Sequence, residues 1–494
     1  MAALPRSSRS PRGDVRKRSA NLTRRNFLQA AGAKATTARK RPNVLFLLTD
    51  QWRAQATGYN GDSNAHTPIL DRFARQCVDY QNAVSGTPVC CPYRASLMTG
   101  EYPLKHGVFI NDVELKPSGP TLAEVFAKSG YRTGYIGKWH LHGSPDGQYG
   151  RRQTFVPPGK RLGFDYWKAF EVSHAYNQSG YYEGDDRQVK MWPGYDALAQ
   201  TRDACQFIEK QSTDPYFLML SVGPPHDPYD SAPAKYKALY DGRKIALRAN
   251  VPEALEDKAQ GMLRGYYSHI AALDDCLGQL LGAIDRSGSA NDTIVVFTSD
   301  HGDMMLSQGL TTKLYPWDES IRIPFLMRYP AKLKPRKVKT PLNAPDVMPT
   351  LLTACGLSVP ATVQGVNGGS PAALLSLPVP SHEARRYGFA EYRGLRTDRY
   401  TYVRSISGPW LLYDNERDPF QKHNLIGDPA ASALRAGLEG QLASMLKEAG
   451  DEFLPAAEYV RRAHLEHYRE LNVPIGATRS PWGDWESTLK SAAK

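Results

Sequence analysis

The sequence predicts an α/β sandwich built around a large, mainly parallel mixed sheet. Two observations lead to this prediction. Short apolar runs typical of buried strands alternate along the chain with amphipathic helical patterns. Several of these runs end in polar residues, as strands do at the ligand-binding edge of an open parallel sheet. With 41% hydrophobic and 23% charged residues among 494, the composition excludes disorder, collagen-like repeats and coiled coil.

The charge of the chain is concentrated at its start. There are 62 Lys and Arg against 50 Asp and Glu, and twelve of the basic residues lie in residues 1–42 beside a single acid, Asp14. The rest of the chain is therefore close to neutral, and we expect no nucleic-acid partner. The longest purely apolar run, Val44 to Leu48, is far shorter than the roughly 20 residues of a transmembrane helix, so we expect no membrane span.

Residues 1–41 have the features of an export leader. The segment from Thr23 to Leu28 resembles a twin-arginine motif, and small-residue cleavage sites follow at Ala31–Ala33 and Ala33–Ala35. The alternative is a basic tail without structure. We expect an exported protein, periplasmic or extracellular.

The first predicted strand is Asn43–Thr49, an aliphatic run that ends at Asp50. A helix is expected over His66–Cys77, with Thr67 as its N-cap and Pro68 in its first turn. The next helix opens with a capping box at Thr121–Glu124 and stops at Gly130, before a strand at Tyr131–Ile136.

The second half of the chain repeats this alternation. The patterns predict strands at Tyr216–Val222 and Thr293–Ser299, separated by a long amphipathic helix that starts near Met262 and ends near Gly288. Short strands at Tyr387–Arg404 and Leu411–Tyr413 and a closing helix from Leu434 to Leu446 follow.

Gly and Ser residues at 365–371 indicate a boundary, which gives a leader (1–41), a catalytic domain (42–370) and a smaller C-terminal domain (371–494).

The six cysteines include no CxxC spacing, which argues against a disulfide scaffold and a zinc cluster.

Polar residues follow four of the expected strands. They are Asp50 with Gln51, Lys138 with His140, His226, and Asp300 with His301. A single Asp after a strand is often only the N-cap of the next helix. Four such ends together predict an active site at the carboxyl edge of the sheet.

Part of this set has the chemistry of a metal site. Asp50, Gln51 and Asp300 offer the oxygen ligands that Ca²⁺ prefers, whereas His301 is unusual for Ca²⁺ and extends the choice to Mn²⁺ or Zn²⁺. The spacing predicts a site and leaves the metal open.

The segment from Pro88 to Gly100 contains a candidate nucleophile. Pro92 is placed to open a helix, so Cys90 is expected just before the helix N-terminus, where unpaired N–H groups favour negative charge. The alternatives are two buried small cysteines or a vicinal disulfide with Cys91. The nearby Arg94 favours a reactive position.

These residues resemble a known family. Cys90-x-Pro92-x-Arg94, followed by Ala95–Gly100, is similar to the signature of the formylglycine-dependent sulfatases, and Gly130–His140 resembles their second signature. The resemblance extends from about Pro42 to about Asn424. It implies an alkaline-phosphatase-like fold, with a large α/β domain and a smaller α+β C-terminal domain containing an antiparallel sheet.

The resemblance also implies a role for each candidate residue. A formylglycine-generating enzyme would oxidise Cys90 to formylglycine, whose hydrate attacks the sulfur of a sulfated small molecule or glycan. One divalent metal ion, usually Ca²⁺ in this family, would be held by Asp50, Gln51, Asp300, His301 and the modified Cys90. The remaining catalytic residues would be Arg94, Lys138, His140, His226 and Lys313, of which Lys138, His226 and Lys313 would also bind substrate.

Two positions depart from the family pattern. Gln51 stands where a second Asp is common, and Tyr93 stands where a small residue is common. Because of Gln51, a phosphonate or phosphate ester hydrolase of the same superfamily is an alternative function. Because of Tyr93, a non-catalytic carbohydrate-binding relative is a second alternative. His142, Asp274 and Asp303 are expected to be structural.

Overall fold

The computed structural model describes residues 41–143, 154–210, 214–380 and 391–467. The expected leader lies outside these ranges apart from Arg41, as does the start of the strand expected from Tyr387. None of the helices in the described ranges is both long and apolar enough to cross a membrane.

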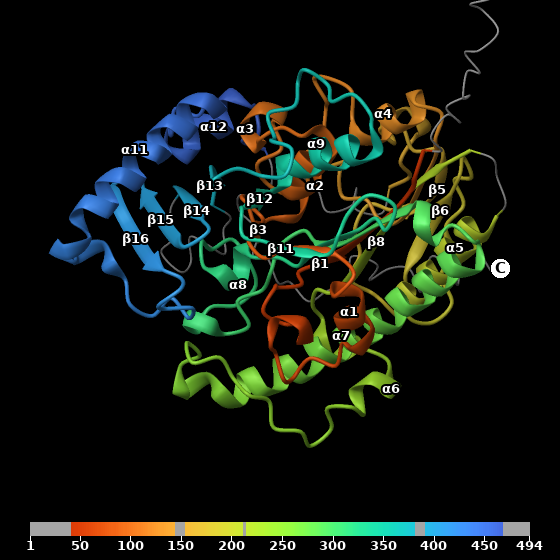
Figure 1. The fold of residues 1–494 in the computed structure, drawn as a ribbon, viewed down its shortest axis with the longest axis horizontal. Helices are drawn as coiled ribbons and strands as arrows, with labels where there is room; N and C mark the ends of the chain where they lie inside the picture. Colours follow the sequence, from red (N-terminus) through yellow and green to blue (C-terminus); the bar gives the residue numbers. More distant parts are fainter. Residues whose placement is uncertain (1–40, 144–153, 211–213, 381–390, 468–494) are drawn as a thin grey trace, which may run out of the picture. The chain divides into compact units, whose positions relative to one another are not determined.

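A ten-stranded mixed sheet forms the centre of the molecule (Figure 1). Its strand order is β11-β2-β10-β9-β1-β8-β4-β5-β6-β7, and the run from β9 to β5 is parallel. Antiparallel pairings join β10 to β9 and β6 to β5, so the sheet is mixed at both sides, as predicted. The bounds are β1 Asn43–Asp50, β2 Val78–Tyr80, β4 Arg132–Lys138, β5 Tyr166–Phe170, β6 Gly180–Glu183, β7 Lys190–Met191, β8 Tyr216–Pro225, β9 Thr293–Ser299, β10 Phe325–Arg328 and β11 Arg336–Val338.

The strand β1 shows why the sheet is covered on both faces. Its side chains alternate between faces, so Val44 and Phe46 belong to one apolar core while Leu45 and Leu47 belong to the other. All four side chains are buried. A strand that is apolar on both faces must lie inside a sandwich, which is the arrangement seen here.

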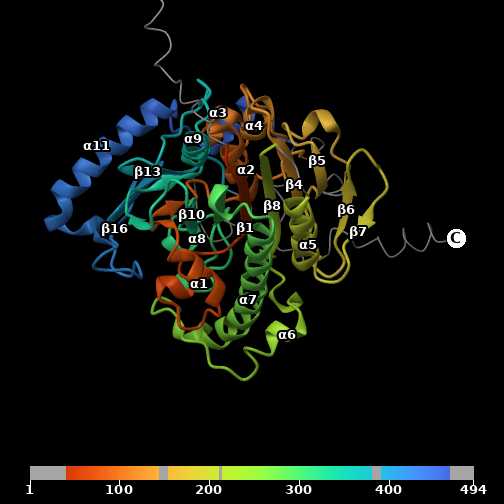
Figure 2. The ribbon, with the colours of Figure 1, turned by 45° about the vertical axis from the view of Figure 1, so that its right-hand side comes forward.

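Helices cover the two faces (Figure 2). The long helix α7 and the helix α5 pack in the same core as Leu45, whereas α2, α4 and α9 pack in the core that contains Phe46. The bounds are α1 Pro68–Ala74, α2 Cys90–Thr99, α3 Pro103–His106, α4 Leu122–Lys128, α5 Asp196–Glu209, α6 Ala234–Lys237, α7 Glu256–Arg286, α8 Asp318–Ile321, α9 Ala344–Cys355, α11 Ser432–Ala449 and α12 Ala456–Arg462.

The start of α1 differs from expectation. Thr67 precedes the helix as predicted, but its side chain makes no capping bond to it. Its hydroxyl instead donates to Asp71 and accepts from the N–H of Gly58. The carboxylate of Asp274, from α7, accepts from the N–H groups of the first turn of α1, including Leu70 at 2.7 Å. Asp274 is thus structural, as expected.

A four-stranded antiparallel sheet follows, in the order β13-β14-β15-β16. The bounds are β13 Ala372–Leu377, β14 Tyr392–Thr397, β15 Tyr400–Ser405 and β16 Gly408–Asp414, and a two-stranded sheet pairs β3 Ala83–Val84 with β12 Leu342–Asn343. The single strand expected to end at Arg404 is therefore two strands joined by a turn, and β13 was not predicted. One face of the small sheet packs against α11, and the other packs in the core of Leu314 and Trp317.

Candidate functional site

The carboxyl ends of four parallel strands carry polar side chains to one place. Asp50 ends β1, Lys138 ends β4, His226 follows β8 and Asp300 follows β9. Cys90 comes to the same place as the first residue of α2, and all five side chains are buried. The predicted start of this helix was wrong, because Pro92 is its third residue.

A buried guanidinium holds two carboxylates together. Nη2 of Arg94 lies 3.1 Å from Oδ2 of Asp50 and 3.0 Å from Oδ2 of Asp300. Nζ of Lys138 lies 2.6 Å from the same oxygen of Asp50. Burial alone would raise the pKa of Asp50, but the charges of Lys138 and its other cationic neighbours hold that pKa well below its usual range. Asp50 is therefore ionised at neutral pH.

The thiol of Cys90 lies among positive groups. Its Sγ is 3.2 Å from Nε2 of His301, 3.6 Å from Nζ of Lys313 and 3.7 Å from Nζ of Lys138. Burial and the charge of Asp50 raise the pKa of this thiol, but the three neighbours together bring it well below the usual value. The position therefore favours a negatively charged group.

Four side chains could hold a cation. One ligand atom from each of Asp50, Cys90, Asp300 and His301 lies within 4.8 Å of the others. Nδ1 of His301 is 2.9 Å from the carbonyl oxygen of Gly302, so an N–H at Nδ1 leaves the Nε2 lone pair facing the carboxylates. Burial and the charge of Asp50 raise the pKa of Asp300. A cation bound beside Asp300 would favour its charged form and lower this pKa. The donor set fits a divalent metal ion.

Gln51 lies beside this group in a constrained backbone conformation. Its φ is 67°, and its N–H donates to Oδ1 of Asp300 at 3.1 Å. Its Oε1 accepts from Nζ of Lys313 at 3.1 Å, and the same Nζ lies 2.7 Å from Nε2 of His226. Gln51 thus links the carboxylates to the Lys313–His226 pair.

His140 contacts the site through a different set of groups. Its Nε2 lies 3.2 Å from Oδ1 of Asp112, and its carbonyl oxygen accepts from the thiol of Cys91 at 3.0 Å. Burial would lower the pKa of His140, but Cys91 and Asp112 raise it well above the usual value. Glu171, which follows β5, accepts the His140 N–H through its carbonyl oxygen at 2.7 Å and so fixes the backbone here.

The structure brings together every candidate site residue that the sequence named, and His140 joins them through a side-chain interaction with Cys90. Direct contacts between side chains join Asp50, Gln51, Cys90, Arg94, Lys138, His226, Asp300, His301 and Lys313. His140 also interacts with Cys91 and Asp112.

Three contacts were missed from the sequence. Asp303 was expected to be structural, yet its Oδ2 accepts from Nε2 of Gln51 at 2.7 Å. Ser221 accepts from Nη1 of Arg94 at 2.7 Å, and the ring of His174 stacks on that of His226 with 4.1 Å between centroids. The position of Asp303 at a strand end was a usable signal, whereas Ser221 and His174 have no distinguishing sequence pattern.

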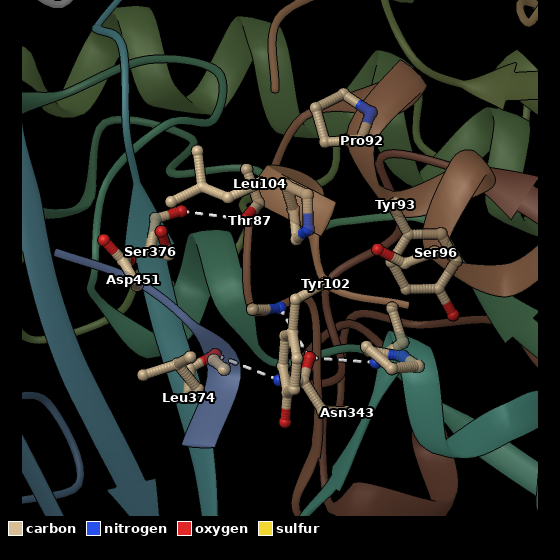
Figure 3. A pocket seen from close by; sticks show the side chains of 15 residues that line it. Thr87, Pro92, Tyr93, Ser96, Tyr102, Leu104, Asn343, Leu374, Ser376 and Asp451 are labelled. Atoms are coloured by element: carbon tan, nitrogen blue, oxygen red, sulfur yellow. Dashed lines mark hydrogen bonds between the residues drawn. The ribbon is translucent and has the colours of Figure 1, made fainter. Parts of the chain in front are cut away.

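The loop before Cys90 is fixed by the segments behind it (Figure 3). The N–H of Gly86 donates to Oδ1 of Asn343 at 3.0 Å, and the hydroxyl of Thr87 donates to the carbonyl of Ser376 at 2.8 Å. The N–H of Ser376 returns a bond to the carbonyl of Gly86. The cavity among these residues is about 20 Å³, which is room for one water, so it is no substrate site.

Comparisons with known proteins match most of the chain. A sulfatase family model matches residues 42–357, and a model of the C-terminal region of N-sulphoglucosamine sulphohydrolase matches residues 307–448. An ulvan-active sulfatase of Formosa agariphila is 42% identical in an alignment 466 positions long, which covers 89% of this chain and 89% of that protein. An endo-4-O-sulfatase of Bacteroides thetaiotaomicron is 31% identical and covers 83% of this chain and 92% of its own length.

Solved structures share the fold. A Bacteroides thetaiotaomicron structure from work on the metabolism of multiple glycosaminoglycans has a TM-score of 0.76 and 29% identity, over 86% of this chain and 100% of the other. The phosphonate monoester hydrolase of Agrobacterium radiobacter has a TM-score of 0.65 and 22% identity, over 83% and 96%. The predicted alkaline-phosphatase-like fold is confirmed.

Proposed function

This chain belongs to the sulfatase family and is a sulfuric ester hydrolase, and we propose that it cleaves sulfate monoesters of a glycan through a formylglycine at position 90. The observation that carries the proposal is the position of Cys90, a buried thiol within 4 Å of two lysines and an imidazole. An ulvan-active sulfatase and an endo-4-O-sulfatase among the relatives support a glycan as the substrate.

A divalent metal ion completes the proposed site. Asp50, Gln51, Asp300 and His301 would hold it together with the oxidised side chain at position 90, and the oxygen-rich set favours Ca²⁺, with Mn²⁺ as the alternative. When bound, such an ion acts as a Lewis acid on sulfate oxygens and lowers the pKa of a coordinated hydroxyl.

The cations of the chain itself bind the anionic ester. The ammonium groups of Lys138 and Lys313 lie 3.7 Å and 3.6 Å from the sulfur of Cys90. Both would face the non-bridging oxygens of a sulfate whose sulfur is attacked from position 90. Arg94 stays with Asp50 and Asp300 and orients them.

Proton transfers are assigned to two histidines. His226 lies against Lys313 and would protonate the leaving oxygen of the sugar. His140, in its neutral form, would take a proton from the second hydroxyl of the hydrated aldehyde, which releases sulfate and restores the aldehyde. Asp112, 3.2 Å from Nε2 of His140, would orient the imidazole and stabilise its charged form.

The remaining features of the proposal concern how the protein is made. A formylglycine-generating enzyme would act on Cys90 during biosynthesis, and residues 1–41 would direct export to the periplasm or beyond. We also propose that the catalytic domain ends near residue 370 and that residues 371–494 form the smaller domain.

Mass spectrometry of the tryptic peptide Gln76–Arg94 tests the proposal. The protein is made in a host able to install formylglycine, and the peptide is treated with an aldehyde-trapping reagent. A trapped aldehyde at Cys90, with Cys91 unmodified, supports the proposal. Intact thiols at both positions overturn it. Rates on sulfated oligosaccharides and on matched phosphate esters then separate sulfatase from phosphatase activity.

A further inference from the structure

Gln51 is held in place by a group on the side away from Lys313. Its Nε2 donates to Oδ2 of Asp303 at 2.7 Å and lies 3.3 Å from the hydroxyl of Tyr229. Tyr229 in turn donates to the same carboxylate oxygen of Asp303. Gln51 and Asp303 are both fully buried, so these bonds do not compete with bulk water.

These contacts determine which end of the amide faces the site. A carboxylate can accept only from the NH₂ group of Gln51, and a lysine ammonium can donate only to its oxygen. Asp303 on one side and Lys313 on the other therefore require the same orientation, with Oε1 toward the site. The N–H of Met305 donates to Oδ1 of Asp303 at 2.9 Å and fixes the carboxylate itself.

The same contacts explain why an amide stands at position 51. A Glu there, which has the same length as Gln, would place a second carboxylate against Asp303 in a buried position. Two buried carboxylates in contact repel each other or share a proton, and either change disturbs the geometry of a ligand. Gln51 avoids this repulsion, and its Oε1, which accepts from Lys313, has a second lone pair that could bind a cation.

We propose that Asp303 is a positioning residue that holds the carboxamide oxygen of Gln51 toward the metal site. The inference rests on the proposed function, in which Gln51 is a metal ligand. Asp303 itself contacts no candidate ligand other than Gln51 in the contacts that the described residues make, so its effect on the metal passes through the amide.

An exchange of the two groups tests this inference. Gln51→Glu alone creates the repulsion, and Asp303→Asn alone presents an NH₂ group to the donors Gln51 and Tyr229. The double variant Gln51→Glu/Asp303→Asn restores one donor and one acceptor across the contact. Each single change should weaken Mn²⁺ binding at least about tenfold, the cost of roughly one lost buried hydrogen bond to a charged group. The double variant should regain most of that loss.

The readout is the dissociation constant of Mn²⁺ for metal-stripped, full-length protein, measured by calorimetric titration. The thermal midpoint of each metal-free protein is measured beside it. Asp346→Asn is the matched control, because Asp346 is also a buried carboxylate that accepts from backbone N–H groups, including Asn343 at 2.8 Å. It should leave the Mn²⁺ constant unchanged even if it lowers the midpoint.

The outcomes are distinguishable. Single variants that bind Mn²⁺ like the wild type, or a double variant no better than its weaker parent, would overturn the role of Asp303 while leaving the metal site intact. A wild-type protein that binds neither Mn²⁺ nor Ca²⁺ would overturn the proposed metal site and this inference with it.

Discussion

Lys313 places its ammonium 2.7 Å from Nε2 of His226. An ammonium has no acceptor, so Nε2 of His226 accepts from it, and the ring proton lies on Nδ1, 3.0 Å from the carboxylate of Asp227. For the proposed protonation of the leaving oxygen, Nε2 must first gain a proton, and Lys313 must move away from it toward the sulfate oxygens. If both residues act as proposed, we expect sulfate binding by Lys313 to be coupled to leaving-group protonation by His226.

This coupling predicts a dependence on the leaving group. His226→Ala should lower kcat about 10²–10⁴-fold on sulfated sugars, whose alkoxide needs a proton, and far less on 4-nitrophenyl sulfate, whose phenolate does not. Lys313→Ala should lower kcat/KM on both, because Lys313 also lies 3.6 Å from Cys90 Sγ. Steady-state kinetics on both esters provide the check. An equal loss on the two substrates for His226→Ala would rule out its role as the acid.

Replacing the nucleophile separates attack from release. Cys90→Ser should react once, because a serine sulfate ester has no second hydroxyl on the same carbon to expel the sulfate. The product burst should not exceed the enzyme concentration, and the intact mass should rise by one sulfate. Cys91→Ser, one residue away, is the control and should keep turning over. Sustained turnover by Cys90→Ser would contradict the scheme.

Removal of the metal should lower stability. The carboxylates of Asp50 and Asp300 lie close together in a buried site, and a cation bound only by the folded chain stabilises it by about 2.7 kcal/mol at a hundredfold excess over its Kd. A chelator should therefore lower Tm, and Ca²⁺ or Mn²⁺ should restore it. An Asp300→Asn variant should show a much smaller metal-dependent shift. The absence of any shift in the wild type would count against the site.

A buried carboxylate that takes no part in the proposed reaction gives a test of pH dependence. Burial raises the pKa of Asp346 from its ordinary value near 3.8 to about 6. The folded chain then binds the proton more tightly than the unfolded chain, so this stabilisation is complete below the unfolded value and is lost as the pH rises through about 6.

Asparagine at 346 does not titrate. Relative to Asp346→Asn, the wild type should therefore lose about 2–3 kcal/mol of unfolding free energy between about pH 4 and about pH 8. Urea unfolding of both proteins at the two pH values measures this difference. A constant difference between the proteins across that range would show that Asp346 keeps an ordinary pKa.

The sequence predicted best those site residues that directly follow a buried strand. Asp50, Lys138, His226 and Asp300 could be predicted because each follows a buried strand, and parallel strands bring their carboxyl ends to one edge. The role of Lys313 came from the resemblance, as did the oxidation of Cys90 to formylglycine, whereas Cys90 was already a candidate nucleophile from its place at the start of an expected helix.

The misses have two physical causes. Pro92 can occupy the third position of α2 because the first N–H groups of a helix have no partner within it, so a proline there costs no hydrogen bond. The bond between Gln51 and Asp303 spans 252 residues, and no local pattern encodes a contact of that separation.

The bonds from Gly86 and Thr87 to Asn343 and Ser376 set a limit on modular exchange. The small sheet begins at Ala372. If this sheet is grafted from a relative, the backbone that holds the loop before Cys90 in position is replaced. A chimera joined near residue 370 would keep every side chain of the active site. It would replace the part of the small sheet that fixes the loop before Cys90. Swaps intended to alter substrate range are therefore better made with β13 left in place.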